Sequence, residues 1–171
     1  DLSLRLYPLT DAVLKEVAKL QNLTALGLGG TQITDAGLKD LAKLQNLKEL
    51  HLSGTQITDA GLKDVAKLQK LKQLWLSGTK ITDAGLKELA KLQQLTQLSL
   101  PYQITDKGLK DVAKLQQLKE LHFDPFKIED EEFMEQAKLL KLNVLIPERK
   151  RKLPILGRPE AATDLKAAME R

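Results

Sequence analysis

Hydrophobic positions recur along this chain with a fixed period of 24 residues. The clearest unit, LKELHLSGTQITDAGLKDVAKLQK, runs from Leu47 to Lys70, and the units at Leu23 to Asn46 and Leu71 to Gln94 are nearly identical to it. Each unit opens with the pattern LxxLxL, which places leucines on one side of an extended segment. The pattern GLKDVAKL follows, and its apolar residues have helical spacing. We therefore predict one strand and one helix in each unit.

The same unit extends, with changes, over most of the chain. Residues 1–22 match a unit that lacks the start of its strand, and residues 95–117 match a unit whose loop is one residue shorter. Residues 118–141 form a degenerate unit, and Leu142 to Ile146 is predicted to be a final strand. Strands joined through helices run parallel, and stacked units bury their core between neighbours. The pattern predicts an α/β solenoid domain over residues 1–146.

The tail, residues 147–171, departs from the repeat. Prolines and a glycine divide its first part into loop segments, and Pro159 to Arg171 is predicted to form a short helix with proline near its first position. We interpret the tail as a C-terminal cap, because a solenoid needs its last hydrophobic face covered. The alternative is a flexible tail that binds a separate partner.

Small polar residues mark the start of each helical pattern. A Thr-Asp pair such as Thr58-Asp59 precedes each helix, where either side chain can cap it and the aspartate suits the helix dipole. A glycine follows in the first turn of four units, at Gly37, Gly61, Gly85 and Gly108. Glycine within a helix costs about 1 kcal/mol relative to alanine, so its recurrence predicts close backbone packing at this point.

The run LxxLxLxxTxITDAGL resembles the LxxLxLxxNxL core of the leucine-rich repeat family. The ITDAGL part is similar to the cysteine-containing subtype, with Thr31, Thr55 and Thr79 in the Cys or Asn position, and the short unit resembles bacterial repeats. The resemblance implies a horseshoe with a parallel sheet on the concave face, helices on the convex face and a protein-binding role. It also implies that these threonines face inward and hydrogen-bond the loop backbone from repeat to repeat.

Composition narrows the classes of function. The chain has no cysteine, which excludes disulfides, thiol catalysis and cysteine-bound metal. The N-terminal residues lack a signal-peptide pattern and no apolar run is long enough to span a membrane, so the sequence is compatible with the cytoplasm without fixing a location. No catalytic motif and no phosphate-binding loop is found, and we predict a non-enzymatic protein without a cofactor.

Within LxxLxL, residues between the leucines are predicted to face away from the core. They form three rows over the predicted concave face. The first comprises Ser3, Gly27, His51, Trp75, Ser99 and His122, the second Ala25, Glu49, Gln73, Gln97 and Glu120, and the third Thr24, Lys48, Lys72, Thr96 and Lys119. We predict that a protein or peptide partner binds to a monomer on this face. The predicted contact residues are Lys48, Glu49, His51, Lys72, Gln73, Trp75, Gln97, Ser99 and Tyr102.

Trp75 is the only tryptophan and is the expected centre of contact, because tryptophan is enriched at binding hot spots. The alternative is a partly buried tryptophan that packs over its neighbours. Tyr102, in the shortened loop, is either a binding residue at the rim or the harmless filling of a deletion. His51 and His122 lie three strands apart, about 14 Å, which is too far for them to share one metal ion.

Positive charge supplies the remaining alternatives. The net charge is +4, from 27 basic and 23 acidic residues. Lysines such as Lys63 and Lys67 recur on the helices, and Arg149 to Lys152 is the densest basic run. Either could meet a polyanion such as nucleic acid, but the helical lysines alternate with acids, so this is the less favoured function. A structural or engineered repeat scaffold without a dedicated ligand is the other alternative.

Overall fold

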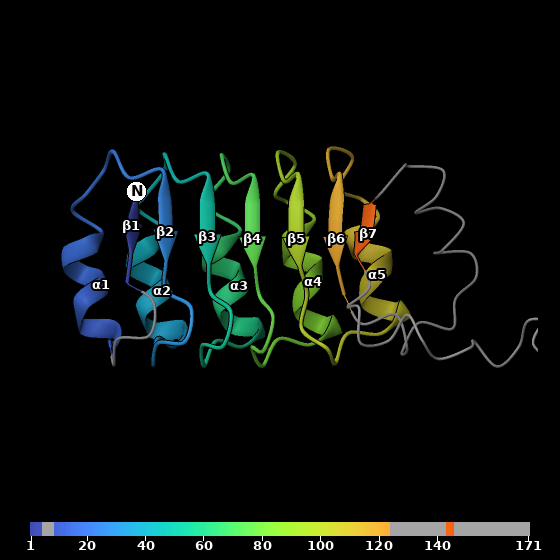
Figure 1. Ribbon diagram of the computed structural model, residues 1–171, viewed down its shortest axis with the longest axis horizontal. Coiled ribbons are helices and arrows are strands. Elements are labelled where there is room, and N and C mark those ends of the chain that lie inside the picture. The colour runs from blue at the N-terminus through green and yellow to red at the C-terminus, as the bar shows by residue number, and fades with distance from the viewer. Residues whose placement is uncertain (5–8, 124–142, 146–171) are drawn as a thin grey trace, which may run out of the picture.

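The computed structural model describes residues 1–4, 9–123 and 143–145. Seven parallel strands form one open sheet in chain order. They are β1 (Leu2–Ser3), β2 (Ala25–Gly27), β3 (Glu49–His51), β4 (Gln73–Trp75), β5 (Gln97–Ser99), β6 (Glu120–His122) and β7 (Asn143–Leu145). The helices are α1 (Asp11–Val17), α2 (Asp35–Leu41), α3 (Asp59–Val65), α4 (Asp83–Leu89) and α5 (Asp106–Val112). The helices form a single layer along the sheet (Figure 1), as the repeat pattern predicts.

The period of the sequence is also the register of the sheet. Leu50 on β3 pairs with Leu74 on β4, 24 residues further on. Leu98 on β5 pairs with Leu121 on β6, and this spacing of 23 residues absorbs the deletion in the fifth unit. The shortened loop therefore leaves the alignment of the strands unchanged, and residues in equivalent positions of every unit form straight rows across the sheet.

The core lies between the sheet and the helices. Leu47, Leu50 and Leu52 of one unit are fully buried, and Leu62 and Val65 of the following helix cover them at 0% and 1% exposure. Each buried side chain of this kind contributes about 1.5–3 kcal/mol by leaving water. Phe123 of the sixth unit is buried as well. Phe126 and Phe133, the other two aromatic residues of that unit, lie outside the described residues.

The threonines in the Cys or Asn position are buried, as predicted. The Thr55 hydroxyl donates a 2.7 Å hydrogen bond to the Leu52 carbonyl oxygen, three residues earlier in the same unit. Thr31 and Thr79 make the same bond at the same distance. The expectation that this position links one repeat to the next is therefore wrong for the hydroxyl. A hydroxyl is short and reaches only the turn that it sits in, where it satisfies a buried carbonyl.

Other polar groups link neighbouring units. The Asp35 carboxylate accepts two hydrogen bonds from Thr58, from the backbone N–H to Oδ1 at 2.8 Å and from the hydroxyl to Oδ2 at 2.6 Å. The same pair of bonds recurs in Asp11–Thr34, Asp59–Thr82 and Asp83–Thr105. The sequence indicated a capping role for both residues, and a cap bond forms at Thr34 and Thr58.

The glycines of the first helical turn make room for these aspartates. A Cβ atom at Gly37 would lie 2.5 Å from Asp11 Oδ1 and 2.6 Å from Leu14 Cδ1 of the preceding unit. At Gly61, Gly85 and Gly108 an added Cβ would likewise meet the preceding aspartate. Close packing at these glycines is therefore confirmed, and the neighbour that requires it is a hydrogen-bonded carboxylate.

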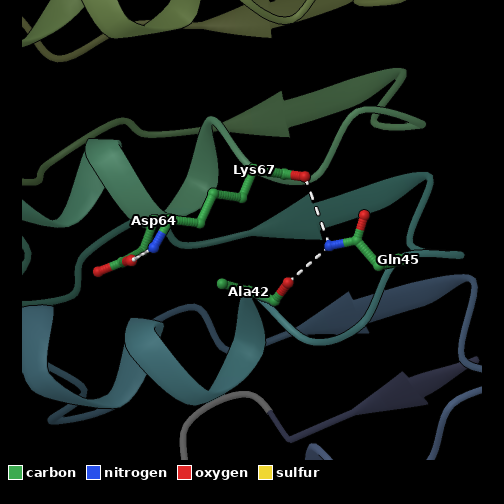
Figure 2. A network of polar contacts seen from close by, with 4 residues as sticks. All are labelled: Ala42, Gln45, Asp64 and Lys67. Atoms are coloured by element: carbon green, nitrogen blue, oxygen red, sulfur yellow. Dashed lines mark hydrogen bonds and ion pairs between the residues drawn. The ribbon is translucent and has the colours of Figure 1, made fainter.

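The ends of the helices are also tied to one another. The Gln45 side-chain amide donates to the Ala42 carbonyl oxygen at 2.7 Å, at the end of α2, and to the Lys67 carbonyl oxygen of the next unit at 3.5 Å (Figure 2). Carbonyl groups at a helix end lack partners within the helix, so such a side chain satisfies them. Together these bonds hold the repeats in a fixed mutual position.

Candidate binding face of the sheet

One face of the sheet carries no helix in the described part of the chain, and we call it the helix-free face. Leucines at the centre of each strand point to the core, so their neighbours along the strand point to this face. The register confirms two of the three predicted rows. His51 pairs with Trp75, Trp75 with Ser99 and Ser99 with His122, while Glu49, Gln73, Gln97 and Glu120 pair in the same order. This arrangement places most of the predicted contact residues on one surface.

Trp75 and His51 form an aromatic pair in the middle of the sheet. Their ring centroids are 3.6 Å apart and the planes differ by 6°, so the rings stack face to face. Both side chains are half-buried. Trp75 is thus partly packed over a neighbour, and it still presents surface to solvent. The stack fixes the rotamers of both rings, which makes this point of the face rigid.

Carboxylate and amide groups lie beside the aromatic pair. Glu49 is two residues before His51 on β3, and Gln73 is two residues before Trp75 on β4, and both are half-buried. Further along the row, the Gln97 amide donates a 2.6 Å hydrogen bond to Glu120 Oε2. The row therefore offers hydrogen-bonding groups held close to the sheet.

Ser99 contributes less surface than the sequence predicted. It belongs to the aromatic row by register but is only 6% exposed, and its hydroxyl is hydrogen-bonded to that of Ser77. A small side chain between larger ones is covered by them, which the alternation of the strand does not reveal. Ser99 therefore supports the surface in the unbound chain and does not form part of it.

The lysine row lies at the beginning of the strands. Lys48 and Lys72 are exposed, and the Lys72 N–H donates to the Lys48 carbonyl oxygen at 2.8 Å. Lys48 in turn donates to Thr24, and Lys119 to Thr96. The backbone of this row thus extends the sheet, while the ammonium groups reach outward at its edge.

Tyr102 lies at the opposite edge, in the shortened loop after β5, and is 65% exposed. In complete loops a backbone N–H bonds the preceding unit, as from Lys80 to the Ile57 carbonyl oxygen at 3.0 Å. In the short loop the Gln103 side-chain amide reaches back instead, to Ile81 at 2.6 Å and Thr79 at 2.9 Å. The deletion is therefore repaired by a glutamine that the sequence pattern did not single out.

Acidic side chains neutralise part of the positive charge of the helix layer. Five exposed ion pairs of spacing i, i+3 recur from unit to unit, at Lys19–Glu16, Lys43–Asp40, Lys67–Asp64, Lys91–Glu88 and Lys114–Asp111, with distances from 2.6 to 2.8 Å. The hydrogen bond from Lys43 lowers the pKa of Asp40, and that from Lys91 lowers the pKa of Glu88. At neutral pH both carboxylates are charged, and each neutralises one lysine of its own unit.

The two histidines lie far apart on the sheet. His51 and His122 lie on β3 and β6, three strands apart as predicted. No group of three His, Asp or Glu side chains in residues 1–4, 9–123 and 143–145 is arranged to hold a metal ion. None of the described helices has the length and apolar character needed to cross a membrane. The tail and its basic run Arg149–Lys152 lie outside the described residues.

The family description "Leucine Rich repeats (2 copies)" matches residues 21–64 and again residues 45–88. No curated protein matches the sequence. Among solved structures, an internalin of Listeria monocytogenes, InlF, is 29% identical with a TM-score of 0.58, and the match covers 78% of this chain and 44% of that one. A Leptospira interrogans leucine-rich-repeat protein is 25% identical with a TM-score of 0.50, covering 77% of this chain and 39% of that one.

A second Listeria monocytogenes internalin, C2, is 24% identical with a TM-score of 0.52, covering 77% of this chain and 74% of that one, and shows the fold alone. The chain spans less than half the length of internalin F and of the Leptospira protein. The matched repeats, the open parallel sheet with one helix layer, and these similarities agree with one another. The chain therefore has the open solenoid fold seen in leucine-rich-repeat proteins, and its matched repeats are similar to theirs.

Proposed function

We propose that this protein binds another protein or a peptide on its helix-free face, without catalysing a reaction. Leucine-rich repeats commonly mediate protein–protein interaction, which sets the class of function. The observation that supports this face is the stacked pair of Trp75 and His51, half-buried at its centre. Large rigid aromatic groups are the residues that most often contribute the binding energy of an interface.

Rigidity is the proposed mechanism. Inter-repeat hydrogen bonds such as those from Thr58 to Asp35 fix each unit against the next, and the leucine core is fully buried. The backbone of the face and the stacked ring pair are therefore in place before the partner arrives. Ordering a rotamer-rich side chain on binding costs about 0.5–1.5 kcal/mol, and a surface organised in advance avoids part of this cost.

The helix layer is a weaker candidate. Ion pairs such as Lys67–Asp64 remove one net charge per unit, so a polyanion would meet a mixed surface. Counterion release requires lysines that neutralise phosphates, and a lysine already paired with a carboxylate contributes less. We therefore place the partner on the sheet and not on the helices.

Capture from a lysate of the source organism tests this proposal. The immobilised protein is compared with Trp75→His and Lys63→Ala, each checked for unchanged thermal unfolding. Histidine stands at the equivalent position of the preceding unit, so Trp75→His suits the local backbone, while Lys63 is an exposed residue of α3. We expect a partner that is lost with Trp75→His and kept with Lys63→Ala. Loss with Lys63→Ala alone, or a partner indifferent to both, would refute binding at Trp75.

A further inference from the structure

We propose that Val13 ends the stacking of repeats, so that no further unit of the same kind, from this chain or from a second copy, packs on the N-terminal end of the solenoid. Val13 lies in the first turn of α1, at the place that Gly37 occupies in α2. Gly61, Gly85 and Gly108 hold this place in the following helices. Residue 13 belongs to the helix layer and takes no part in the proposed binding on the helix-free face.

The sheet and the core both align Val13 with Gly37. Leu2 on β1 pairs with Leu26 on β2, so the first two units stack in the common 24-residue register. Both helices begin at the aspartate of their unit, and both bury the leucine that follows the compared position. The Cα–Cβ bond of Val13 therefore points where an added Cβ at Gly37 would point, which is away from the next unit and towards the place of a preceding one.

This place is too small for a Cβ atom wherever one unit receives another. An added Cβ at Gly37 would lie 2.5 Å from Asp11 Oδ1, a contact shorter than Cβ atoms make in proteins. A further unit before the first would bring its own aspartate equally close to the Cβ of Val13, and the two γ-carbons of valine enlarge the collision. Such an aspartate holds the threonine of the next unit by two hydrogen bonds, as Asp35 holds Thr58, so moving it aside breaks them.

The N-terminal end needs such a stop because it is otherwise open. Leu20 is 49% exposed, whereas its equivalents Leu44 and Leu68 are 0% and 1% exposed under the preceding unit. Val13 itself is half-buried and packs on the edge of the core. Since the units are nearly identical, an end that accepts one of them also accepts a copy from another molecule, and such head-to-tail contacts build open chains. A segment of another kind is not excluded, because it need not place a carboxylate beside Val13.

An added repeat tests whether Val13 has this effect. A copy of residues 25–48 is placed directly before Asp1, which then follows the copy as Glu49 follows Lys48 in the chain. Hydrogen exchange measured by mass spectrometry reports whether the backbone amides of the added unit are protected. A docked unit is protected by its neighbour, whereas an undocked unit exchanges almost as an unfolded chain does, because so short a helix is not stable alone. The extended chain is made with native Val13, with Val13→Gly and with Val13→Ala.

We expect protection of the added unit in Val13→Gly alone, with exchange about 100-fold or more slower than in the native background. Since α2 carries Gly37 at the same place, α1 accommodates the glycine. Val13→Ala is the matched control, because it removes the γ-carbons and favours the helix but keeps the Cβ that would meet the aspartate. Its added unit should exchange as fast as in the native background.

Three results would overturn the inference. Protection of the added unit behind native Val13 would show that valine does not prevent stacking, whatever the glycine variant does. Protection in Val13→Ala would show that the Cβ atom is not the obstacle. Rapid exchange in Val13→Gly would show that something other than residue 13 keeps a further unit from this end.

Discussion

Replacing Gly61 with alanine tests whether inter-repeat packing or helix propensity decides this position. Gly61 occupies the first turn of α3. In an ordinary helix the change to alanine is stabilising by up to about 1 kcal/mol. Here a new Cβ would collide with Asp35 Oδ1 and would lie 2.7 Å from Leu38 Cδ1 and 3.2 Å from Asp35 Cγ, all in the preceding unit. The structure therefore predicts the opposite sign.

The expected loss follows from two terms. Overpacking a close contact costs about 1–3 kcal/mol. Displacing the Asp35 carboxylate also strains its bonds to the Thr58 N–H and hydroxyl, and a hydrogen bond to a charged group contributes about 1.5–3 kcal/mol. Since part of these bonds survives a small shift and alanine returns some helix propensity, we expect Gly61→Ala to be destabilising by about 2–4 kcal/mol.

Urea denaturation followed by circular dichroism measures this difference. Ala60→Gly, an exposed residue of the same turn, is the matched control and should cost no more than about 1 kcal/mol. A double-mutant cycle with Asp35→Ala isolates the collision, because Gly61→Ala should cost less once the carboxylate is absent. Unchanged or increased stability of Gly61→Ala in the native background would contradict the packing argument, as would perfectly additive effects in the cycle.

Three further predictions concern single bonds. Thr55→Val keeps the shape but loses the 2.7 Å bond to the Leu52 carbonyl oxygen, and thermal unfolding should show a loss of about 1–3 kcal/mol, with Thr55→Ser close to native. Gln103→Ala leaves two carbonyl groups of the preceding loop without their donor and should cost about 1–3 kcal/mol by urea denaturation. The Lys43 hydrogen bond lowers the pKa of Asp40 in the folded chain, so its stabilising effect is present above the ordinary aspartate pKa and lost as the pH falls through the lowered value. In a carboxyl NMR titration, Lys43→Ala should move the Asp40 pKa back up.

Features that repeat along the chain were predictable because repetition reveals them. The spacing of leucines predicted the strand register, and Leu50 opposite Leu74 confirms it. The recurring glycine indicated close packing, and the pattern of alternation put Trp75 beside His51 in one row. Each of these three features depends only on the path of the backbone, and the 24-residue repeat determines that path.

Contacts that depend on side-chain length were not predictable in the same way. The sequence suggested that Asp35 serves its own helix, whereas its carboxylate holds Thr58 of the next unit. The recurrence of aspartate and glycine in the same helical turn was the available signal. A glycine that recurs at one position indicates that another group packs closely against it, and the recurring aspartate was a candidate for that group. The burial of Ser99 and the hydrogen bond from Gln103 to Ile81 each occur in a single unit. They depend on the side chains around that one position, so the repeat pattern could not predict them.

Site-specific photo-cross-linking tests the central claim most directly. A photoreactive benzoylphenylalanine is placed either at Gln73, on β4 of the helix-free face, or at Lys63 on α3, and each protein is irradiated with its captured partner. Binding on the helix-free face predicts a covalent adduct from position 73 and none from position 63. An adduct from position 63 with none from position 73 would show that the partner binds the helix layer, and the proposed face would be wrong.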